Sequence, residues 1–221
     1  MDFEIQSEIE NTIPHDFCVT NIKVSVKLPK AVSLDFVVDR CSKIENPVYC
    51  QKATNNIVTF KYNNFTFVLF KSSSKRLADG SVKPQHCNIT KCRTSDDILS
   101  AIQDLLFIVQ QPPMLINYKI DNYSCLAKIH HKRCLAKIHH VIDIESLFLK
   151  EVELLCTYQE ENFPHVSVRC PPHLTSAPNQ LCQIYRTGYI TLVGGKILSE
   201  VETFFKWLLQ KIAPYIKDEC I

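Results

Sequence analysis

The sequence repeats one pattern of strand and helix signals about a hundred residues apart, and this duplication limits the folds open to the chain. The segment SDDILSAIQDLLFIV, residues 95–109, places apolar residues at offsets 0, 4, 7, 8 and 11 from Ile98, as on one helix face. The segment SEVETFFKWLLQKI, residues 199–212, repeats these offsets from Val201, which lies 103 residues further on. We therefore predict two long helices, the first with Ser95 as its N-cap.

Each half also begins with a strand signal. Residues 20–28 alternate apolar and polar side chains, with Asn21 and Lys23 on the polar face, as in a half-buried strand. A similar stretch begins at Asn122, which lies 101 residues after Asn21. Short helices are expected at residues 32–38 and 142–148, and further strands at 57–62, 65–71, 88–90, 166–170, 181–186 and 189–193. Strands outnumber helices, so we predict an α+β fold in which helices cover one face of an antiparallel sheet.

A shorter repeat interrupts the second half. The letters CLAKIHH stand at residues 125–131 and again at 134–140, and the offset between the halves grows from 101 to 110 across them. This indicates an insertion of one nine-residue copy, which must leave the strand because an odd insertion reverses side-chain facing. The cysteines and histidines lack Cys-x2-Cys and His-x3-His spacings, so we expect no metal, with a zinc site as the competing interpretation.

Composition and motifs argue against an enzyme. The chain has only 4 glycines and lacks glycine-rich phosphate-binding signatures and Gly-x-Ser-x-Gly, so we expect no catalytic residues and no cofactor. Its 25 basic and 23 acidic residues nearly cancel, so any basic surface must be local. The 11 cysteines without paired spacing favour buried thiols in a cytosolic or nuclear protein.

The duplicated order of strand, short helix, strands and long helix resembles the TATA-box-binding protein (TBP) family. In the second half, ENFPHVSVR at 161–169 is similar to the family's Phe-Pro strand entry, and YRTGYITLVGGK at 185–196 aligns without gaps with its hairpin. VTNIKVSVKL at 19–28 and FKSSSK at 70–75 resemble the first half more loosely. The resemblance implies a pseudo-symmetric saddle, a curved antiparallel sheet with helices on its convex face.

This resemblance also implies a domain organisation. Residues 1–16 would be an N-terminal extension, residues 17–112 the first TBP-like repeat and residues 113–217 the second, with the nine-residue insertion near 125–140.

Carried over by position, the resemblance implies residues that bind DNA through the minor groove. Asn21 and Asn122 would hydrogen-bond the acceptor edges of A·T pairs. Phe70, Phe163 and Tyr185 would be apolar wedges that enter the base stack. The remaining candidates lie on the same strands: Lys23, Lys27, Lys128, Thr191 and Val193.

Several positions depart from the family pattern. The other first-half wedge falls near Ala53, which has no ring, although Tyr49 is close enough that a shifted alignment could supply one. Tyr185 adds a hydroxyl, and Val193 stands where the family has threonine. Ordinary alternatives remain: polar strand positions for the asparagines, core packing for the aromatic residues and solvated faces for the lysines.

Two functions follow from the resemblance. The first is a divergent TBP-like transcription initiation factor that binds A·T-rich promoter DNA and recruits general transcription factors and RNA polymerase, in the nucleus or at the site of viral transcription. The second is a TBP-fold protein-interaction module in a transcription complex, with weak or no DNA bending. The near-neutral charge and the missing wedge favour weaker or altered bending.

Overall fold

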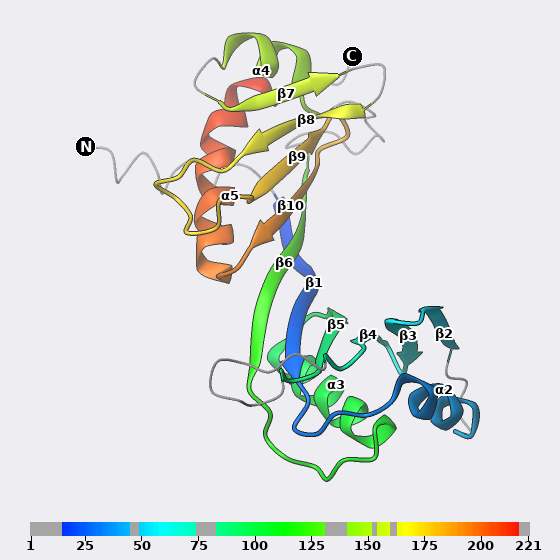
Figure 1. The fold of residues 1–221 in the computed structure, drawn as a ribbon. Helices are drawn as coiled ribbons and strands as arrows, with labels where there is room; N and C mark the ends of the chain where they lie inside the picture. Colours follow the sequence, from blue (N-terminus) through cyan, green and yellow to red (C-terminus); the bar gives the residue numbers. More distant parts are fainter. Residues whose placement is uncertain are drawn as a thin grey trace. The chain divides into compact units, whose positions relative to one another are not determined.

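The computed structural model describes residues 15–44, 49–73, 83–130, 141–151, 154–159 and 163–216, without the side chains of residues 52, 53, 159, 163 and 164. Within these ranges ten strands form one sheet in the order β2-β3-β4-β5-β1-β6-β10-β9-β8-β7 (Figure 1). The strands are β1 (His15–Lys27), β2 (Tyr49–Thr54), β3 (Ile57–Tyr62), β4 (Phe65–Phe70), β5 (His86–Cys92), β6 (Tyr118–Ile129), β7 (Cys156–Gln159), β8 (Phe163–Arg169), β9 (Leu181–Tyr185) and β10 (Tyr189–Gly195). The helices are α2 (Leu34–Ser42), α3 (Ser95–Ile108), α4 (Ile144–Lys150), α5 (Leu198–Ile212) and the 3-10 turn η1 (Ala213–Tyr215).

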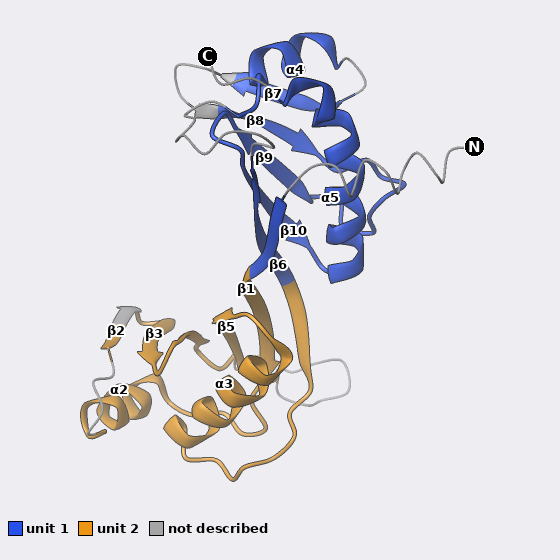
Figure 2. Ribbon diagram, turned by 180° about the vertical axis from the view of Figure 1, so that it is seen from behind, with its two compact units in different colours: residues 1–19, 122–221 blue, residues 20–121 orange. Residues whose placement is uncertain are grey.

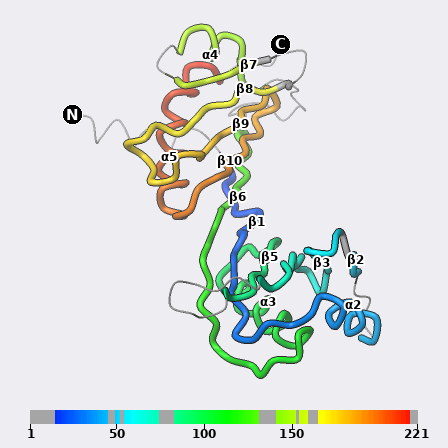
Figure 3. Tube along the Cα trace, viewed as in Figure 1, coloured from blue at the N-terminus to red at the C-terminus, as the bar shows by residue number. Residues whose placement is uncertain are grey.

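The predicted α+β class is confirmed. Both long helices are present, and the trace in Figure 3 passes through strand, short helix, strands and long helix twice. The sequence missed β2 and β7, which end the strand order on either side. The predicted N-cap of α3 was wrong: the helix is capped by Thr94, whose hydroxyl accepts from the backbone N–H of Asp97 at 3.1 Å. Asp97 returns a bond to the backbone N–H of Thr94, which completes a capping box.

The chain divides into two compact units (Figure 2). Unit 1 comprises residues 1–19 and 122–221, and unit 2 comprises residues 20–121. The start of β1 belongs to unit 1 because Phe17 stacks on Phe205 of α5, with ring centroids 5.1 Å apart. The expected repeat limits, 17–112 and 113–217, stay a prediction about the duplicated sequence. Residues 131–140, with most of the CLAKIHH tandem, lie outside the described residues.

One face of the strands in each unit packs against helices. In unit 1, α5 buries Val201, Phe204 and Leu208 against alternate strand residues such as Ile184 and Leu192. Burying an aliphatic or aromatic side chain of this size contributes about 1.5–3 kcal/mol, so this layer supplies the main stabilisation of the unit.

In unit 2, α2 lies against β2 and β3, while α3 lies against β5. We call the other side of the strands the open face of each unit. None of the described helices is long and apolar enough to cross a membrane.

Candidate nucleic-acid interface

The two asparagines singled out by the repeat make equivalent contacts in their own units. In unit 2, the side-chain oxygen of Asn21 on β1 accepts a hydrogen bond from the backbone N–H of Lys91 at 2.5 Å. In unit 1, the side-chain oxygen of Asn122 on β6 accepts one from the backbone N–H of Gly194 at 2.6 Å. The repeat has therefore kept a contact as well as a residue type.

Both partners lie at an irregularity in a neighbouring strand. Lys91 has φ of 73° and Gly194 has φ of 90°, in the left-handed region that favours glycine. The pairing register shifts beside each of them, between Ile22 and Val24 in unit 2 and between Val193 and Gly195 in unit 1. A bulge turns a backbone N–H out of the ladder, and the asparagine oxygen satisfies it.

This geometry fixes the orientation of each amide. The oxygen is oriented toward a backbone donor, and the NH2 group supplies the two N–H donors of each amide. In unit 1 the amide nitrogen of Asn122 is also 3.5 Å from the hydroxyl oxygen of Ser124, a weak contact. Such a donor suits a partner whose edge offers only acceptors.

The predicted wedge residues lie at the ends of strands. Phe70 ends β4, where buried residues alternate with partly exposed ones, and it belongs to the partly exposed set that lies on the open face of unit 2. Tyr185 ends β9, is partly exposed, and packs against the ring of His165 with centroids 5.1 Å apart. Its hydroxyl is 3.5 Å from the side-chain oxygen of Gln183. The backbone of Phe163 begins β8, but its side chain lies outside the described part.

The strand register indicates which residue of the first repeat matches Phe163. Phe70 pairs with Ile57 in unit 2, as Tyr185 pairs with His165 in unit 1. Phe163 lies two residues before His165, so its counterpart lies two residues before Ile57 and is Asn55. The first repeat therefore has an amide in the turn between β2 and β3 where the second repeat has a phenylalanine.

Tyr49, the alternative source of a ring, lies at the start of β2. It pairs with Lys61, whose ammonium nitrogen is 5.3 Å from the centre of the tyrosine ring, a cation–π arrangement. The ring is 56% exposed. The register therefore places an exposed aromatic residue on the outermost strand of unit 2, but at a different position from the wedge.

A row of polar side chains on the open face of unit 1 contains Thr191, which the sequence predicted as a candidate, and Gln183 and His165, which it did not. Gln183 on β9 contacts two neighbouring strands: its side-chain nitrogen is 3.2 Å from His165 Nε2 on β8, and its oxygen accepts from the hydroxyl of Thr191 on β10 at 3.0 Å. His165 is only 7% exposed, and burial lowers the pKa of its imidazole. Val193, further along β10, is partly exposed and pairs with Ser124. The hydrogen bonds keep this part of the face in a fixed arrangement.

The predicted lysines differ in their exposure and in the contacts of their ammonium groups. Lys27 is exposed and Lys23 is partly exposed, both on the open-face side of β1. Lys128 instead donates to the carbonyl of Thr187 and lies 4.0 Å from the centre of the Tyr189 ring. Burial lowers the pKa of Lys128. Its ammonium group is thus engaged within the β9–β10 hairpin.

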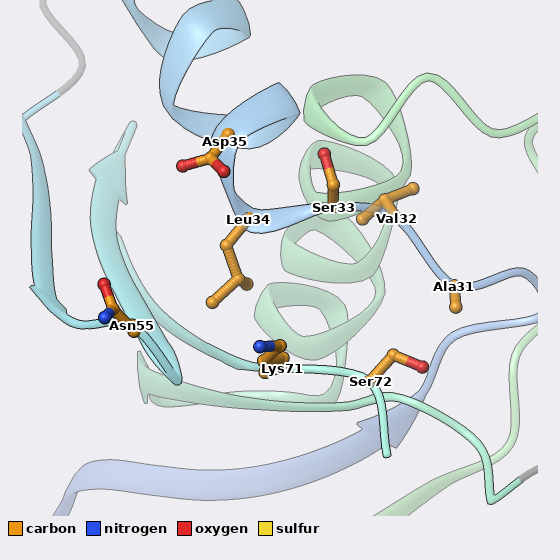
Figure 4. Close-up of a pocket in the computed structure, with 8 residues that line it drawn as sticks. All are labelled: Ala31, Val32, Ser33, Leu34, Asp35, Asn55, Lys71 and Ser72. Carbon is orange, nitrogen blue, oxygen red and sulfur yellow. The ribbon is translucent and has the colours of Figure 1, made fainter. Parts of the chain in front are cut away.

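A pocket of about 530 Å³ lies beside the start of α2 in unit 2 (Figure 4). Leu34, Asn55 and Lys71 border it. Its backbone is already bonded: Gln85 donates to the carbonyl of Val32 at 3.1 Å and accepts from its N–H at 2.8 Å. The Ser33 hydroxyl caps α2. Nothing in this lining points to a particular ligand.

Metal binding and thiol catalysis find little support among the described residues. They contain no group of three or more metal-ligating side chains. Burial raises the pKa of the Cys41, Cys125 and Cys170 thiols to about 12, so these cysteines stay protonated and inert at neutral pH.

The fold and the paired asparagines define a duplicated α+β protein with a helix-covered and an open side to the sheet in each unit. Residues 117–215 match the family described as Transcription factor TFIID (or TATA-binding protein, TBP). The structure of TBP from Methanococcus jannaschii is similar with a TM-score of 0.63 and 16% sequence identity, covering 90% of this chain and 99% of that chain. Together these findings show that the chain has the TBP fold and that its second half resembles the TBP family in sequence.

Two other comparisons add nothing to this assignment. A heterotetrameric sarcosine oxidase from Corynebacterium sp. U-96, in complex with pyrrole 2-carboxylate, matches with a TM-score of 0.35 and 9% identity over 99% of this chain and 96% of that chain. A likeness at that level carries no argument. The sequence has no match among curated proteins.

Proposed function

We propose that the protein is a TBP-like transcription initiation factor that binds A·T-rich promoter DNA in the minor groove. General transcription factors and RNA polymerase are the further partners, and the nucleus, or the site of viral transcription for a virus-encoded protein, is the place of action. The observation that carries the proposal is the matched pair of asparagines, each of which accepts a hydrogen bond from a backbone N–H through its side-chain oxygen.

The chemistry of the groove supports this choice. In the minor groove an A·T pair shows acceptors only, in either orientation. An amide whose oxygen already accepts a backbone N–H still offers two N–H donors, and these complement that edge. In this proposal Asn21 and Asn122 read A·T pairs, while Thr191 and Val193 line the neighbouring part of the groove floor.

The residues at the wedge positions favour a smaller deformation of the duplex than a full set of aromatic wedges would produce. Phe70, Phe163 and Tyr185 are proposed as wedges. The position of the first repeat that matches Phe163 holds Asn55, whose amide cannot unstack base pairs as an aromatic ring does. The tyrosine hydroxyl must also lose its contact with Gln183 on entering the stack. We propose a kink mainly where unit 1 binds, with less deformation where unit 2 binds.

Asn55 also supports a second function, a TBP-fold interaction module with little or no DNA bending. The two functions differ in whether an A·T-rich duplex binds and bends. Fluorescence anisotropy with a labelled A·T-rich duplex measures affinity, and energy transfer between dyes at its two ends measures bending. The first function is supported by salt-dependent binding with an increase in energy transfer, and absence of both would favour the second.

Variants at Tyr185 make the bending assay specific. Tyr185→Ala removes the proposed wedge and should lower the energy transfer of the bound duplex, whereas Tyr185→Phe should keep it or increase it. Leu99→Ala is a matched control, because Leu99 is an exposed apolar residue of α3, on the helix side. Equal bending by all of these proteins would remove Tyr185 from the interface.

A further inference from the structure

A carboxylate lies on the open face of unit 2. The hydroxyl of Ser25 on β1 donates to Asp121 Oδ2 on β6, and Ser25 Oγ is also 3.1 Å from the side-chain oxygen of Asn88 on β5. Ser25 stands between Val24 and Val26, both completely buried on the helix side, so Ser25 projects to the opposite side. The Asp121 side chain therefore reaches the open face.

This carboxylate retains unused acceptor capacity. An ionised aspartate has two oxygens with about four lone-pair sites, and the serine hydroxyl can fill only one of them. Among the described residues, no lysine or arginine lies within ion-pair distance of Asp121. The nearby imidazole of His86 feels the carboxylate, but burial is the main cause of its lowered pKa.

An acceptor on this face is unsuited to a groove floor that carries only acceptors. A·T pairs show adenine N3 and thymine O2 in the minor groove, and a carboxylate close to either would be repelled. A G·C pair adds one donor there, the exocyclic amino group of guanine. A hydrogen bond from that amino group to an ionised carboxylate would be charge-assisted and correspondingly strong.

We propose that Asp121 makes the site select a G·C pair at one position by accepting a hydrogen bond from the guanine amino group in the minor groove. The inference rests on the proposed function, because it requires that the open face binds the minor groove. The residue that matches Asp121 in the first repeat, 101 positions earlier, is Thr20. The acid is therefore confined to one repeat, and the preference gives the binding site a direction.

Inosine provides the test, since an I·C pair differs from G·C in the minor groove only by lacking the amino group. Anisotropy would be measured with an A·T-rich duplex, with duplexes carrying one G·C pair at each position in turn, and with matched I·C duplexes. We expect one position at which G·C binds about tenfold more tightly than I·C, the size of one well-formed contact.

Variants assign the effect to the carboxylate. Asp121→Ala should abolish the difference between G·C and I·C, whereas Asp121→Asn, which is isosteric and keeps one acceptor oxygen, should retain part of it. Asp39→Ala is the control, because Asp39 is an exposed acid on α2 whose partner is Lys43 at 2.7 Å. Normal binding of the all-A·T duplex by Asp121→Asn shows that the variant is folded.

The outcomes separate this inference from the proposed function. Binding of A·T duplexes without any position at which G·C exceeds I·C would overturn the role of Asp121 and leave minor-groove binding standing. A preference that persists in Asp121→Ala would also overturn it. Failure of the wild-type protein to bind every duplex would overturn both.

Discussion

Asn122 Oδ1 accepts a hydrogen bond from the backbone N–H of Gly194, at 2.6 Å, so the amide that we propose as a DNA contact is also part of the folded structure of unit 1. The same holds for Asn21 and Lys91 in unit 2. A substitution at either asparagine therefore affects stability and recognition together. Aspartate separates the two effects, because it keeps the acceptor oxygen and lacks the NH2 group.

We expect Asn122→Asp to unfold at nearly the wild-type denaturant concentration and to lose most of its affinity for an A·T duplex. Asn122→Ala should lose affinity and also about 1 kcal/mol of unfolding free energy, since the Gly194 N–H loses its partner. Urea unfolding followed by anisotropy measures both quantities. Affinity unchanged in Asn122→Asp would show that the amide nitrogen does not contact DNA.

Lys91 and Gly194, the two bulge residues with positive φ, predict stability changes of opposite sign. In Gly194→Ala the new Cβ would lie 2.4 Å from the carbonyl oxygen of Asn179 in a left-handed conformation, so we expect a loss of about 2 kcal/mol or more. Lys91→Gly relieves a left-handed lysine, and we expect a gain of up to about 1 kcal/mol. Urea unfolding of both variants checks the signs. Destabilisation by Lys91→Gly would contradict the bulge at that position.

The buried His165 predicts a dependence of stability on pH. Burial lowers the pKa of its imidazole in the folded state, so the unfolded chain binds the proton more readily. The stabilisation is present above the ordinary histidine pKa of about 6.5 and is lost as the pH falls below that value. We expect His165→Gln to lose less stability than the wild type between pH 7 and pH 5 in urea unfolding. Equal losses of unfolding free energy in the two proteins would contradict the burial effect. The lowered pKa of His86 is common to both proteins and so does not alter the comparison.

The three lysines predict different salt dependences of DNA binding. Each lysine that contacts phosphate should reduce the slope of log affinity against log salt by about 0.9 when it is replaced by alanine. We expect this reduction for Lys23→Ala and Lys27→Ala. Lys128→Ala should change the slope less, because its ammonium group binds the Thr187 carbonyl and the Tyr189 ring. Anisotropy titrations at several salt concentrations compare them, and an equal reduction for all three would contradict this distinction.

The sequence predicted most elements because long apolar periodicities determined them. The helices α3 and α5 and the strand β3 lie where their patterns indicated. The segments YCQKAT and CTYQ, which form β2 and β7, carry short and largely polar patterns, as protected edge strands often do. Their strand character comes from pairing with β3 and β8, which local sequence does not encode.

Part of the candidate site could also be predicted from the sequence. The matched placement of Asn21 and Asn122 was visible as a shift of 101 residues. Their backbone partners were not, because a left-handed Lys91 has no local signal. The Gly194-Gly195 pair could have indicated the second bulge. The contact between Ser25 and Asp121 joins residues 96 positions apart and depends on the pairing of strands.

Replacement of single ring atoms in the DNA tests minor-groove recognition most directly. 3-Deazaadenine removes the adenine acceptor of the minor groove, and 7-deazaadenine removes the adenine acceptor of the major groove. Anisotropy with an A·T-rich duplex carrying either base at the central positions should show weaker binding with 3-deazaadenine and unchanged binding with 7-deazaadenine. Weaker binding with 7-deazaadenine alone would contradict recognition by Asn21 and Asn122 through the minor groove.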